Sequence, residues 1–285
     1  MLQVARLAPA VLGAAVEPVV AFLQQQMNED GGGRDRSGKS DLYYTVFLLE
    51  SLAALGQDPS TGVVRPYLES FQDGEDLDLV HLTCLARCWA ALPGGSPPGQ
   101  RLAERIEAYR AADGGYGPAR GAACGTVYHG FLALGALQDL GRTPADPEGV
   151  LRSVASLSLE NGSYANQQDV PVGATPTTAA AVSILRHHRA PIPAATPDWL
   201  LARARCQGGF VATEDAPVPD LLSTATALHA LAGLKVSLGH MKESMLDFLD
   251  TLWTGKGFCG TWADEAADCE YTYYALLSLG HLSLV

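Results

Sequence analysis

The feature that most constrains this chain is an internal repeat. Residues 257–284 are GFCGTWADEAADCEYTYYALLSLGHLSL, which is a glycine-aromatic turn, an acidic loop and then an apolar helix. The same order occurs at residues 208–234 and 31–55. Successive copies are 38 to 51 residues apart, which leaves room for two helices and two loops in each unit. The copies align on a threonine near the start of each apolar helix: Thr45, Thr83, Thr126, Thr177, Thr224 and Thr272.

The helices that follow these threonines are apolar on nearly all sides, as in TAAAVSIL (178–185) and ATALHALAGL (225–234). A helix that is apolar all round is buried on more than one face. The intervening helices are more amphipathic, and no segment alternates long enough to predict an extended strand. Six buried and six half-exposed helices predict an all-α fold, an (α/α)6 toroid of two concentric rings. Stacked repeats need closure or caps, and closure of a six-unit ring predicts one domain, residues 1–285.

Charge and cysteine content restrict the partners and the compartment. The 285 residues carry a net charge of −12, which disfavours binding to nucleic acid. Six cysteines without a C-x-x-C pair favour a reduced chain, and we expect a cytoplasmic protein. Glu17 and Pro18 interrupt the apolar run near the N-terminus. We therefore expect this segment to be a helix of the fold, and we expect no membrane span.

Several of the repeat segments are specific enough to indicate a family. They are DGGGRDRSGKSDLYYT (30–45), DGGYGPARGAACGTVYHG (113–130), CQGGF (206–210), PDLLSTATALHAL (219–231) and DCEYTYYALLSLGHL (268–282). Over essentially the whole chain, these repeats resemble the protein prenyltransferase β-subunit and terpenoid cyclase superfamily. The β-subunits of farnesyl- and geranylgeranyltransferases are the most similar members. The resemblance implies a toroid whose central apolar cavity holds an isoprenoid chain.

The zinc site of the prenyltransferases is only partly present. That family binds a catalytic zinc with D-x-C at the fifth inner helix and with the histidine of D-x-x-H-T at the sixth. Here Asp220 matches, but Leu222 stands in place of the cysteine; Asp268 matches, but Tyr271 replaces the histidine. Cys269 is a nearby substitute ligand, so the candidate metal ligands are Asp220, Asp268 and Cys269. Zinc-dependent thiol prenylation is therefore not expected in the family's usual form.

Binding of a diphosphate would also differ from that in the prenyltransferases that the chain resembles. The fifth loop has no arginine or lysine, and the fifth and sixth loops are acidic. Their carboxylates would repel a diphosphate unless Mg²⁺ bridges the two, which makes Mg²⁺ a candidate cofactor. The one compact cationic loop contains Arg34 and Arg36, which are candidate contacts for a diphosphate.

A cyclase is the second interpretation. The acidic D-x-D-D-T-A motif of class II terpenoid cyclases becomes PDLLSTA, which keeps only the first aspartate, Asp220. Asp268 and Glu270 are then the candidate acids, because a dry cavity raises the pKa of a carboxyl group. Asp220 and Tyr271 complete the candidate catalytic set. The structural alternatives are helix capping for Asp220 and Asp268, and a favourable helix dipole for Glu270.

Aromatic side chains near the helix starts are candidates for the wall of the substrate cavity. Their ring faces stabilise positive charge, and core packing is the alternative role. The candidate substrate contacts are Tyr44, Tyr128, His129 and Tyr274.

Three functions follow from these residues. The first is an isoprenoid-handling enzyme of the prenyltransferase β-subunit type, with a remodelled and zinc-independent site. The second is a terpenoid cyclase that uses Asp268 or Glu270 as its acid. The third is a non-catalytic lipid-binding or scaffolding toroid. The expected ligand is an isoprenoid or its diphosphate, and the resemblance makes an α-subunit-like protein a candidate partner.

Overall fold

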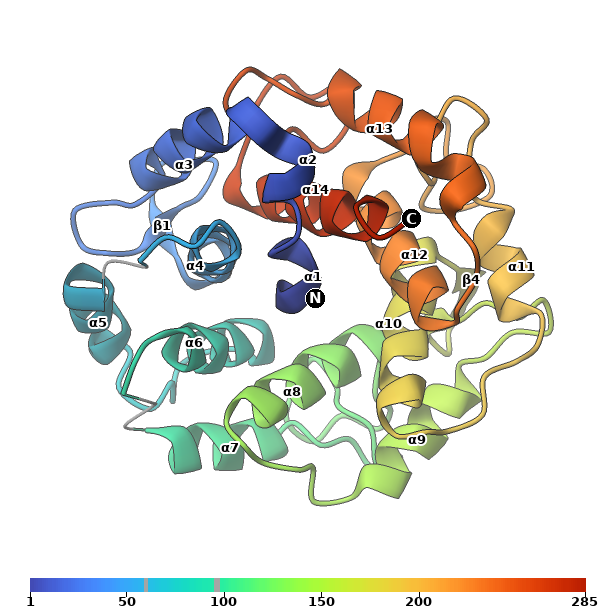
Figure 1. Ribbon diagram of the computed structural model, residues 1–285. Helices are drawn as coiled ribbons and strands as arrows, with labels where there is room; N and C mark the ends of the chain where they lie inside the picture. Colours follow the sequence, from blue (N-terminus) through green and yellow to red (C-terminus); the bar gives the residue numbers. More distant parts are fainter. Residues whose placement is uncertain (59–60, 95–97) are drawn as a thin grey trace. The chain divides into compact units, whose positions relative to one another are not determined.

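The computed structural model describes residues 1–58, 61–94 and 98–285, and most of them are in short helices (Figure 1). The chain divides into two compact units. The first runs from Met1 to Ser60 and from Pro197 to Val285, and the second runs from Thr61 to Thr196.

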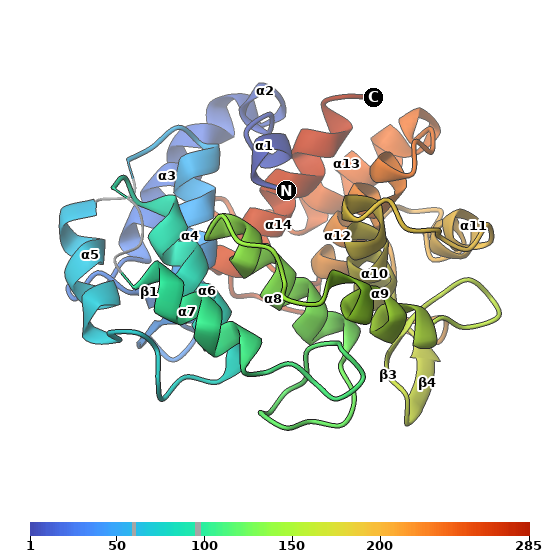
Figure 2. The ribbon, with the colours of Figure 1, turned by 90° about the horizontal axis from the view of Figure 1, so that it is seen from below.

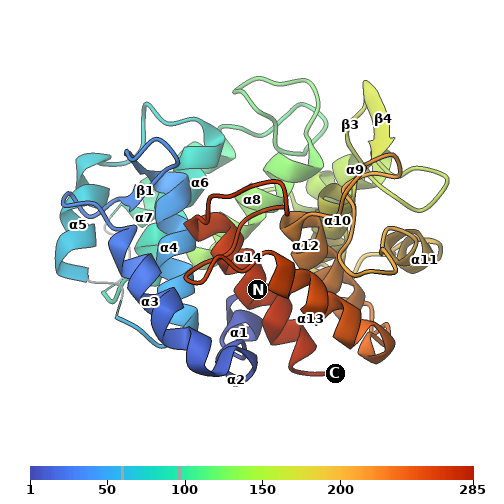
Figure 3. The ribbon, with the colours of Figure 1, turned by 90° about the horizontal axis from the view of Figure 1, so that it is seen from above.

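In the first unit, three buried helices pack side by side: α12 against α14, and α14 against α4 (Figure 3). Its elements are α1 (Leu2–Ala5), α2 (Pro9–Leu12), the 3-10 helix η1 (Gly13–Ala15), α3 (Val16–Gln25), β1 (Gly33–Arg34), β2 (Ser40–Asp41), α4 (Leu42–Ala54), α11 (Thr196–Leu201), α12 (Leu221–Gly233), the 3-10 helix η2 (Gly239–Met241), α13 (Lys242–Thr251) and α14 (Cys269–Leu282).

In the second unit, α8 packs against both α6 and α10. The β3–β4 hairpin projects beyond the ends of α9 and α10 (Figure 2). The elements are α5 (Thr61–Ser70), α6 (Leu79–Ala91), α7 (Gly99–Glu107), α8 (Val127–Asp139), α9 (Pro147–Ser156), β3 (Ala165–Gln167), β4 (Val170–Gly173) and α10 (Thr175–His187).

Buried and more exposed helices alternate along the chain, as the sequence predicts. In the first unit, α4 buries nine of its 13 residues, whereas the preceding α3 buries three of its 10. The strands are two short hairpins, β1–β2 and β3–β4, in the part of the chain that the structure describes. The weak strand signals in the sequence therefore correspond to short turns between helices.

Each buried helix begins with a similar capping arrangement. A residue in extended conformation precedes the helix, and its side chain accepts a hydrogen bond from the backbone N–H three residues later. Such a cap satisfies one of the otherwise unpaired N–H groups of the first turn. Capping residues of this kind are Asp41, Asp78, Thr126, Asp220 and Asp268. The exception is α10, which begins after Ala174 without a side-chain cap and has Pro176 in its first turn.

The repeated threonine ties the preceding turn to the helix. Its hydroxyl accepts a backbone N–H from the turn, as in Phe210 to Thr224 at 2.9 Å, and donates to the capping residue's carbonyl. The same acceptor role is taken by Thr45, Thr178 and Thr272.

In the structure the repeated threonine lies four residues after the capping position, and three of the six threonines aligned in the sequence do not occupy this position. The fourth copy uses Thr178, not Thr177. Thr126 is itself a capping residue, four positions before the register that the other copies define. Thr83 lies five residues after its cap Asp78, one position beyond the register. A sequence alignment on threonine alone does not separate the capping position from the position four residues later.

The N-terminal segment is helical but broken. One stretch of the described residues, Leu2–Gln25, has the length and composition of a membrane span, with a mean hydropathy of 1.6 and 22% of its window buried. The expected absence of a membrane span is therefore not confirmed by this criterion. The stretch bends at Gly13, whose φ is +53°. Within the first unit, α1 packs against α14 and α4, and α3 packs against α4.

Candidate functional site

The site is built around the start of α14. Asp268 caps this helix: its Oδ1 accepts the backbone N–H of Tyr271 at 2.8 Å. Only 5% of Asp268 is exposed, and its second oxygen, Oδ2, accepts a hydrogen bond from Nε of Arg36 at 2.9 Å. A single carboxylate thus caps the helix and binds an arginine from a distant part of the sequence.

Arg36 lies at the tip of the β1–β2 hairpin. The hairpin shape is set locally, because Asp35 accepts the backbone N–H groups of Ser37 and Lys39, both at 2.8 Å. Gly33 is required at the base: a Cβ atom there would lie 2.7 Å from the backbone nitrogen of Thr45. These constraints hold the tip of the hairpin next to α14.

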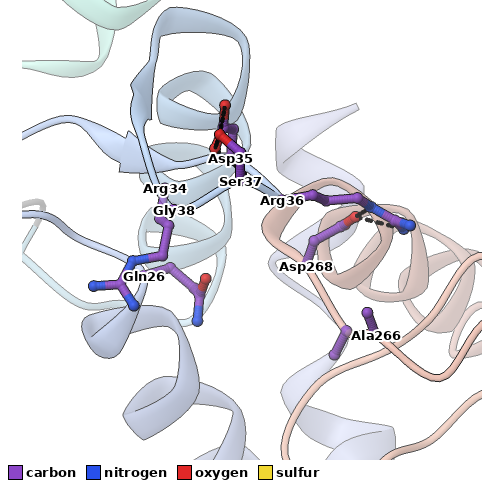
Figure 4. Close-up of a pocket in the computed structure, with 9 residues that line it drawn as sticks. Gln26, Arg34, Asp35, Arg36, Ser37, Gly38, Ala266 and Asp268 are labelled. Atoms are coloured by element: carbon purple, nitrogen blue, oxygen red, sulfur yellow. Dashed lines mark hydrogen bonds and ion pairs between the residues drawn. The ribbon is translucent and has the colours of Figure 1, made fainter.

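The arginine also binds the acidic loop that precedes α14. Nη2 of Arg36 donates to Oδ2 of Asp264 at 2.7 Å. The side chain of Arg36 is 44% exposed, compared with 25% for Asp264 and 7% for Asp268. Figure 4 shows Arg36 extending from the hairpin to Asp268, whereas Arg34 and Gln26 lie next to each other and the Arg34 guanidinium points away from that of Arg36. These residues line a cavity of about 380 Å³, together with the hairpin residues 35–38 and residues 266–268.

A second carboxyl group pairs with a phenol. The hydroxyl of Tyr43 donates a hydrogen bond to Oε1 of Glu270 at 2.6 Å. Tyr43 lies two residues after the cap of α4, and Glu270 lies two residues after the cap of α14. Because α4 and α14 pack together, equivalent positions of two repeats meet.

Aromatic rings surround this pair on α4 and α14. Phe47 contacts Tyr43, Tyr273 and Tyr274, with centroid distances of 5.0, 5.7 and 5.5 Å. Tyr44 lies edge-on to Tyr43 at 5.8 Å. Two predicted substrate contacts, Tyr44 and Tyr274, are therefore part of one aromatic cluster beside Glu270.

Burial controls the acidity of the two carboxyl groups. It raises the pKa of Asp268, and this effect outweighs the opposing hydrogen bonds from Tyr271 and Arg36. It also raises the pKa of Glu270, against the hydrogen bond from Tyr43. Burial, with the nearby carboxylates, raises the pKa of Tyr44 and of Tyr271 to about 12. Both phenols are therefore neutral at pH 7.

Tyr271 is held by two neighbours of different kinds. The guanidinium of Arg36 lies 5.6 Å from the centre of its ring. The ring also lies directly against Gly260, where a Cβ atom would overlap it. The predicted catalytic residues Asp268, Glu270 and Tyr271 thus lie together at the start of α14, where Arg36 of the hairpin contacts Asp268 and Tyr271.

The predicted metal ligands do not form a group. Among residues 1–58, 61–94 and 98–285, no three His, Cys, Asp or Glu side chains lie close enough together to hold a metal ion. Asp220 caps α12 and accepts both the backbone N–H and the hydroxyl of Ser223, at 2.7 Å each. Burial raises the pKa of Asp220 and the pKa of the fully buried Cys269 thiol. A buried thiol with a raised pKa is a poor metal ligand and a poor nucleophile.

Tyr128 and His129 belong to the second unit. Tyr128 is 40% exposed at the start of α8, and its backbone N–H binds the side chain of Asn166. Nδ1 of His129 lies 2.8 Å from the hydroxyl of the capping residue Thr126, and burial lowers the pKa of this histidine. Both positions are explained by local structure within that unit.

Two site residues, Tyr43 and Asp264, were not among the predicted site residues. Their partners Glu270 and Arg36 were predicted, but the pairs were not. A comparison of repeat registers could have found the Tyr43–Glu270 pair, since both lie two residues after an aspartate cap. Nothing in the local sequence indicates that Asp264 pairs with Arg36.

The family follows from a match over most of the chain. A profile described as the prenyltransferase alpha-alpha toroid domain matches residues 16–88, 96–214 and 177–284. The chain therefore belongs to the prenyltransferase alpha-alpha toroid family, and its fold is the predicted α/α toroid. No curated protein sequence matches the chain.

Solved structures share this fold at low sequence identity. Protein geranylgeranyltransferase-I from Candida albicans, complexed with GGPP, is 15% identical with a TM-score of 0.72, over 93% of this chain and 90% of that one. A variant of the type II terpene cyclase MstE from Scytonema, complexed with geranylgeranyl dihydroxybenzoate, is 14% identical with a TM-score of 0.67, over 97% of both chains. An inactive α-1,6-mannanase variant from Salegentibacter is 11% identical with a TM-score of 0.64, over 95% of this chain and 99% of that one. At these identities the likeness shows the fold, and function depends on the site.

Proposed function

We propose that this chain is an isoprenoid-handling enzyme in which the carboxyl group of Glu270 donates a proton to a substrate alkene. The observation that carries the proposal is the Tyr43–Glu270 pair, set beside the aromatic side chains of α4 and α14. The family match and the two isoprenoid-bound neighbours support the substrate class. This function is the cyclase interpretation of the sequence.

The chemistry requires an acid, a fixed geometry and a cation-stabilising wall. Burial raises the pKa of Glu270, which favours the protonated form that an acid needs. The hydrogen bond from Tyr43 fixes the orientation of the carboxyl group. The carboxyl O–H bond breaks, a C–H bond forms on one alkene carbon, and the neighbouring carbon becomes cationic. Aromatic ring faces within about 6 Å of such a cation stabilise it.

Asp268 is less suited to this role. Its two oxygens accept hydrogen bonds from the backbone of Tyr271 and from Arg36, so it serves as a cap and as the partner of a cation. In the proposed enzyme Asp268 positions the first turn of α14, and Glu270 is the acid. Tyr271 closes the site against Gly260.

Prenyl transfer from a diphosphate is the second candidate function, and one observation favours it. Arg34 and Arg36 line the cavity of about 380 Å³ beside Asp268, where a diphosphate could be neutralised. In this version Mg²⁺ would assist the neutralisation, zinc is not required, and an α-subunit-like protein is the partner. The acidic loop before α14 holds Asp264 and Asp268, whose oxygens suit Mg²⁺.

The test compares turnover and binding for three forms of the protein: the parent, Glu270→Gln and Glu265→Gln. Glu265 is an exposed carboxyl on the same acidic loop and serves as the matched control. Geranylgeraniol and geranylgeranyl diphosphate are incubated with each form, with Mg²⁺ present and then chelated, and products are identified by mass spectrometry. We expect Glu270→Gln to lose about 100-fold or more in turnover while it still binds the substrate. We expect Glu265→Gln to match the parent.

Other outcomes separate the remaining functions. Turnover of the diphosphate alone, abolished by chelation and unaffected by Glu270→Gln, supports prenyl transfer and contradicts the acid role. Binding of isoprenoids by the parent with no product from either substrate supports the non-catalytic lipid-binding toroid.

A further inference from the structure

The N-terminal segment of the first unit presents aliphatic side chains to solvent. Residues 2–25 have a mean hydropathy of 1.6, yet only 22% of the apolar window is buried. The end of the segment is packed, since Phe22 is 3% exposed and Leu23 is fully buried, but Leu7 and Val11 are 38% and 37% exposed. Burial within the chain therefore does not explain the apolar composition of the first part of the segment.

The exposed side chains share one face of this first part. The aliphatic residues that face solvent are spaced three and four positions apart, as on one side of a helix. They are Leu7, Ala10, Val11 and Ala14. The opposite side packs inward, where Ala5 and Ala8 are fully buried. Because α2 packs against α14, the exposed face is held on the unit.

A second group of exposed apolar side chains adjoins this face. Leu284 is 65% exposed and Val285 is 43% exposed, and both follow the end of α14. Figure 2 and Figure 3 both show α2 and the end of α14 at the same end of the first unit. Four of the nine large hydrophobic side chains that are exposed in the described part of the chain therefore gather there. We call this surface the apolar end; its large members are Leu7, Val11, Leu284 and Val285.

The composition of the apolar end favours a lipid surface over a protein partner. Protein interfaces depend on a few large anchors, mainly tryptophan, tyrosine and arginine. Residues 1–21 contain no aromatic side chain and one arginine, Arg6. The rim carries charges of both signs: Arg6 and Glu17 are exposed, and Nζ of Lys242 donates to the backbone oxygen of Val285 at 2.7 Å. Charges of both signs around an apolar centre complement the phosphate and choline groups of a zwitterionic lipid.

The charge of the chain selects the type of lipid. The net charge is −12, and α13, which packs against α14, carries the exposed carboxylates Glu243, Asp247 and Asp250. Anionic lipids repel such a surface within a Debye length, about 8–10 Å at moderate salt. A zwitterionic bilayer has no net charge and does not repel it.

We propose that the apolar end of the first unit docks on the surface of a zwitterionic lipid bilayer. Leu7, Val11 and Leu284 enter the boundary between headgroups and acyl chains, and Arg6 and Lys242 lie at the level of the phosphate groups. The inference goes beyond the proposed function and does not depend on it.

The segment docks in the plane of the membrane and does not cross the bilayer. Its helices break at Gly13, whose φ is +53°, and its inner side stays packed through Ala5 and Ala8. A crossing segment would have to leave the protein and lose this packing, whereas an interfacial segment buries only its outer face in lipid.

The experiment is flotation of the full chain with vesicles of phosphatidylcholine and, separately, with vesicles of phosphatidylglycerol. We expect the protein to float with phosphatidylcholine and to float less with phosphatidylglycerol, with a difference that shrinks as salt is raised. The double substitution Leu7→Asp with Val11→Asp places two carboxylates on the docking face. We expect it to lower the partition coefficient for phosphatidylcholine by about 10-fold or more.

A matched control makes the same change elsewhere. Val170 and Val172 on β4 of the second unit are 49% and 57% exposed, so they are more accessible than the two residues under test. Val170→Asp with Val172→Asp should float as the parent does. Urea unfolding and circular dichroism establish that each variant is folded.

Other results overturn the inference. They are absence of flotation with phosphatidylcholine, equal flotation by the folded Leu7→Asp and Val11→Asp variant, and stronger flotation with phosphatidylglycerol. A concentration-dependent dimer in lipid-free sedimentation that the same double substitution abolishes would assign the face to a second copy of the chain. Turnover of isoprenoids without flotation removes the docking surface alone, and flotation without turnover removes the enzyme alone.

Discussion

Replacement of Arg36 by glutamine tests how the start of α14 is held together. The substitution removes the charged partner of Asp268, whose side chain is 7% exposed and whose Oδ2 lies 2.9 Å from Nε of Arg36. Loss of one partner of a fully buried ion pair costs about 3–5 kcal/mol, whereas exposed pairs contribute about 0–1 kcal/mol. Because the side chain of Arg36 is 44% exposed, we expect an intermediate loss of about 2 kcal/mol in the free energy of unfolding.

A second substitution separates the charge from the cap. Asparagine caps helices about as well as aspartate, so Asp268→Asn keeps the hydrogen bond to Tyr271 and removes the buried charge. In the Arg36→Gln background, Asp268→Asn should therefore recover about 1 kcal/mol or more. Urea unfolding of the parent, both single variants and the double variant gives the coupling free energy, which we expect to be about 1–2 kcal/mol. Arg152→Gln, at an exposed surface pair, should change stability by less than about 0.5 kcal/mol.

Additivity of the two single substitutions within about 0.3 kcal/mol would contradict the ion pair, because residues in one ion pair should couple. Destabilisation by Asp264→Asn that equals the effect of Arg36→Gln would contradict it as well. That result would place the stabilising interaction at the exposed carboxylate, not at the buried one.

Three further predictions concern the first unit and the cysteines. Burial and the chain's amino terminus lower the pKa of His281 to about 4, and its Nε2 lies 3.0 Å from Nδ1 of His229. The unfolded chain therefore binds a proton at His281 more readily than the folded chain does. The free energy of unfolding should fall by about 2–3 kcal/mol as pH decreases from about 6.5 to 4, and urea unfolding of His281→Gln should lack most of this loss. A Cβ atom at Gly280 would overlap the carbonyl oxygen of Val4, so Gly280→Ala should lower the free energy of unfolding by about 1–3 kcal/mol. Gly135 has open space around it, so Gly135→Ala should be neutral or stabilising by up to about 1 kcal/mol in the same assay. Equal effects at both glycines would contradict the close packing of α1 on α14. Cys124 and Cys206 are exposed, and the other four thiols are buried. A thiol reagent should therefore modify these two cysteines quickly and the other four only when the protein unfolds. Fast reaction of Cys269 would contradict its burial.

Much of the fold is predictable because its determinants are local. Apolar helices, glycine turns and aspartate caps recur at intervals that identify two helices per repeat. The register of the repeat is less predictable, since Thr177 and Thr178 are adjacent in the sequence and only the hydroxyl of Thr178 meets the turn at Tyr164. A second case is Thr126, which is the capping residue of its own copy, because threonine is favoured both at helix caps and in turns.

The site is less predictable because its pairs join distant residues. Tyr43 and Glu270 are 227 positions apart, and Arg36 and Asp268 are 232 apart. The sequence identifies Arg36, Asp268 and Glu270 individually by residue type and loop position. The pairing follows from the packing of α4 against α14, which no local pattern encodes. The metal prediction depended on Asp220, Asp268 and Cys269 meeting, and each is held instead by capping or by burial.

Deuterium incorporation from solvent tests the central claim, proton donation by Glu270, most directly. The parent protein is incubated with geranylgeraniol in deuterated water, and the mass of each product is compared with that formed in ordinary water. Protonation of an alkene by Glu270 places one exchangeable proton on carbon, so we expect each product to gain one mass unit, and we expect Glu270→Gln to form no product. Products without deuterium, or the same deuterated products from Glu270→Gln, would contradict the account.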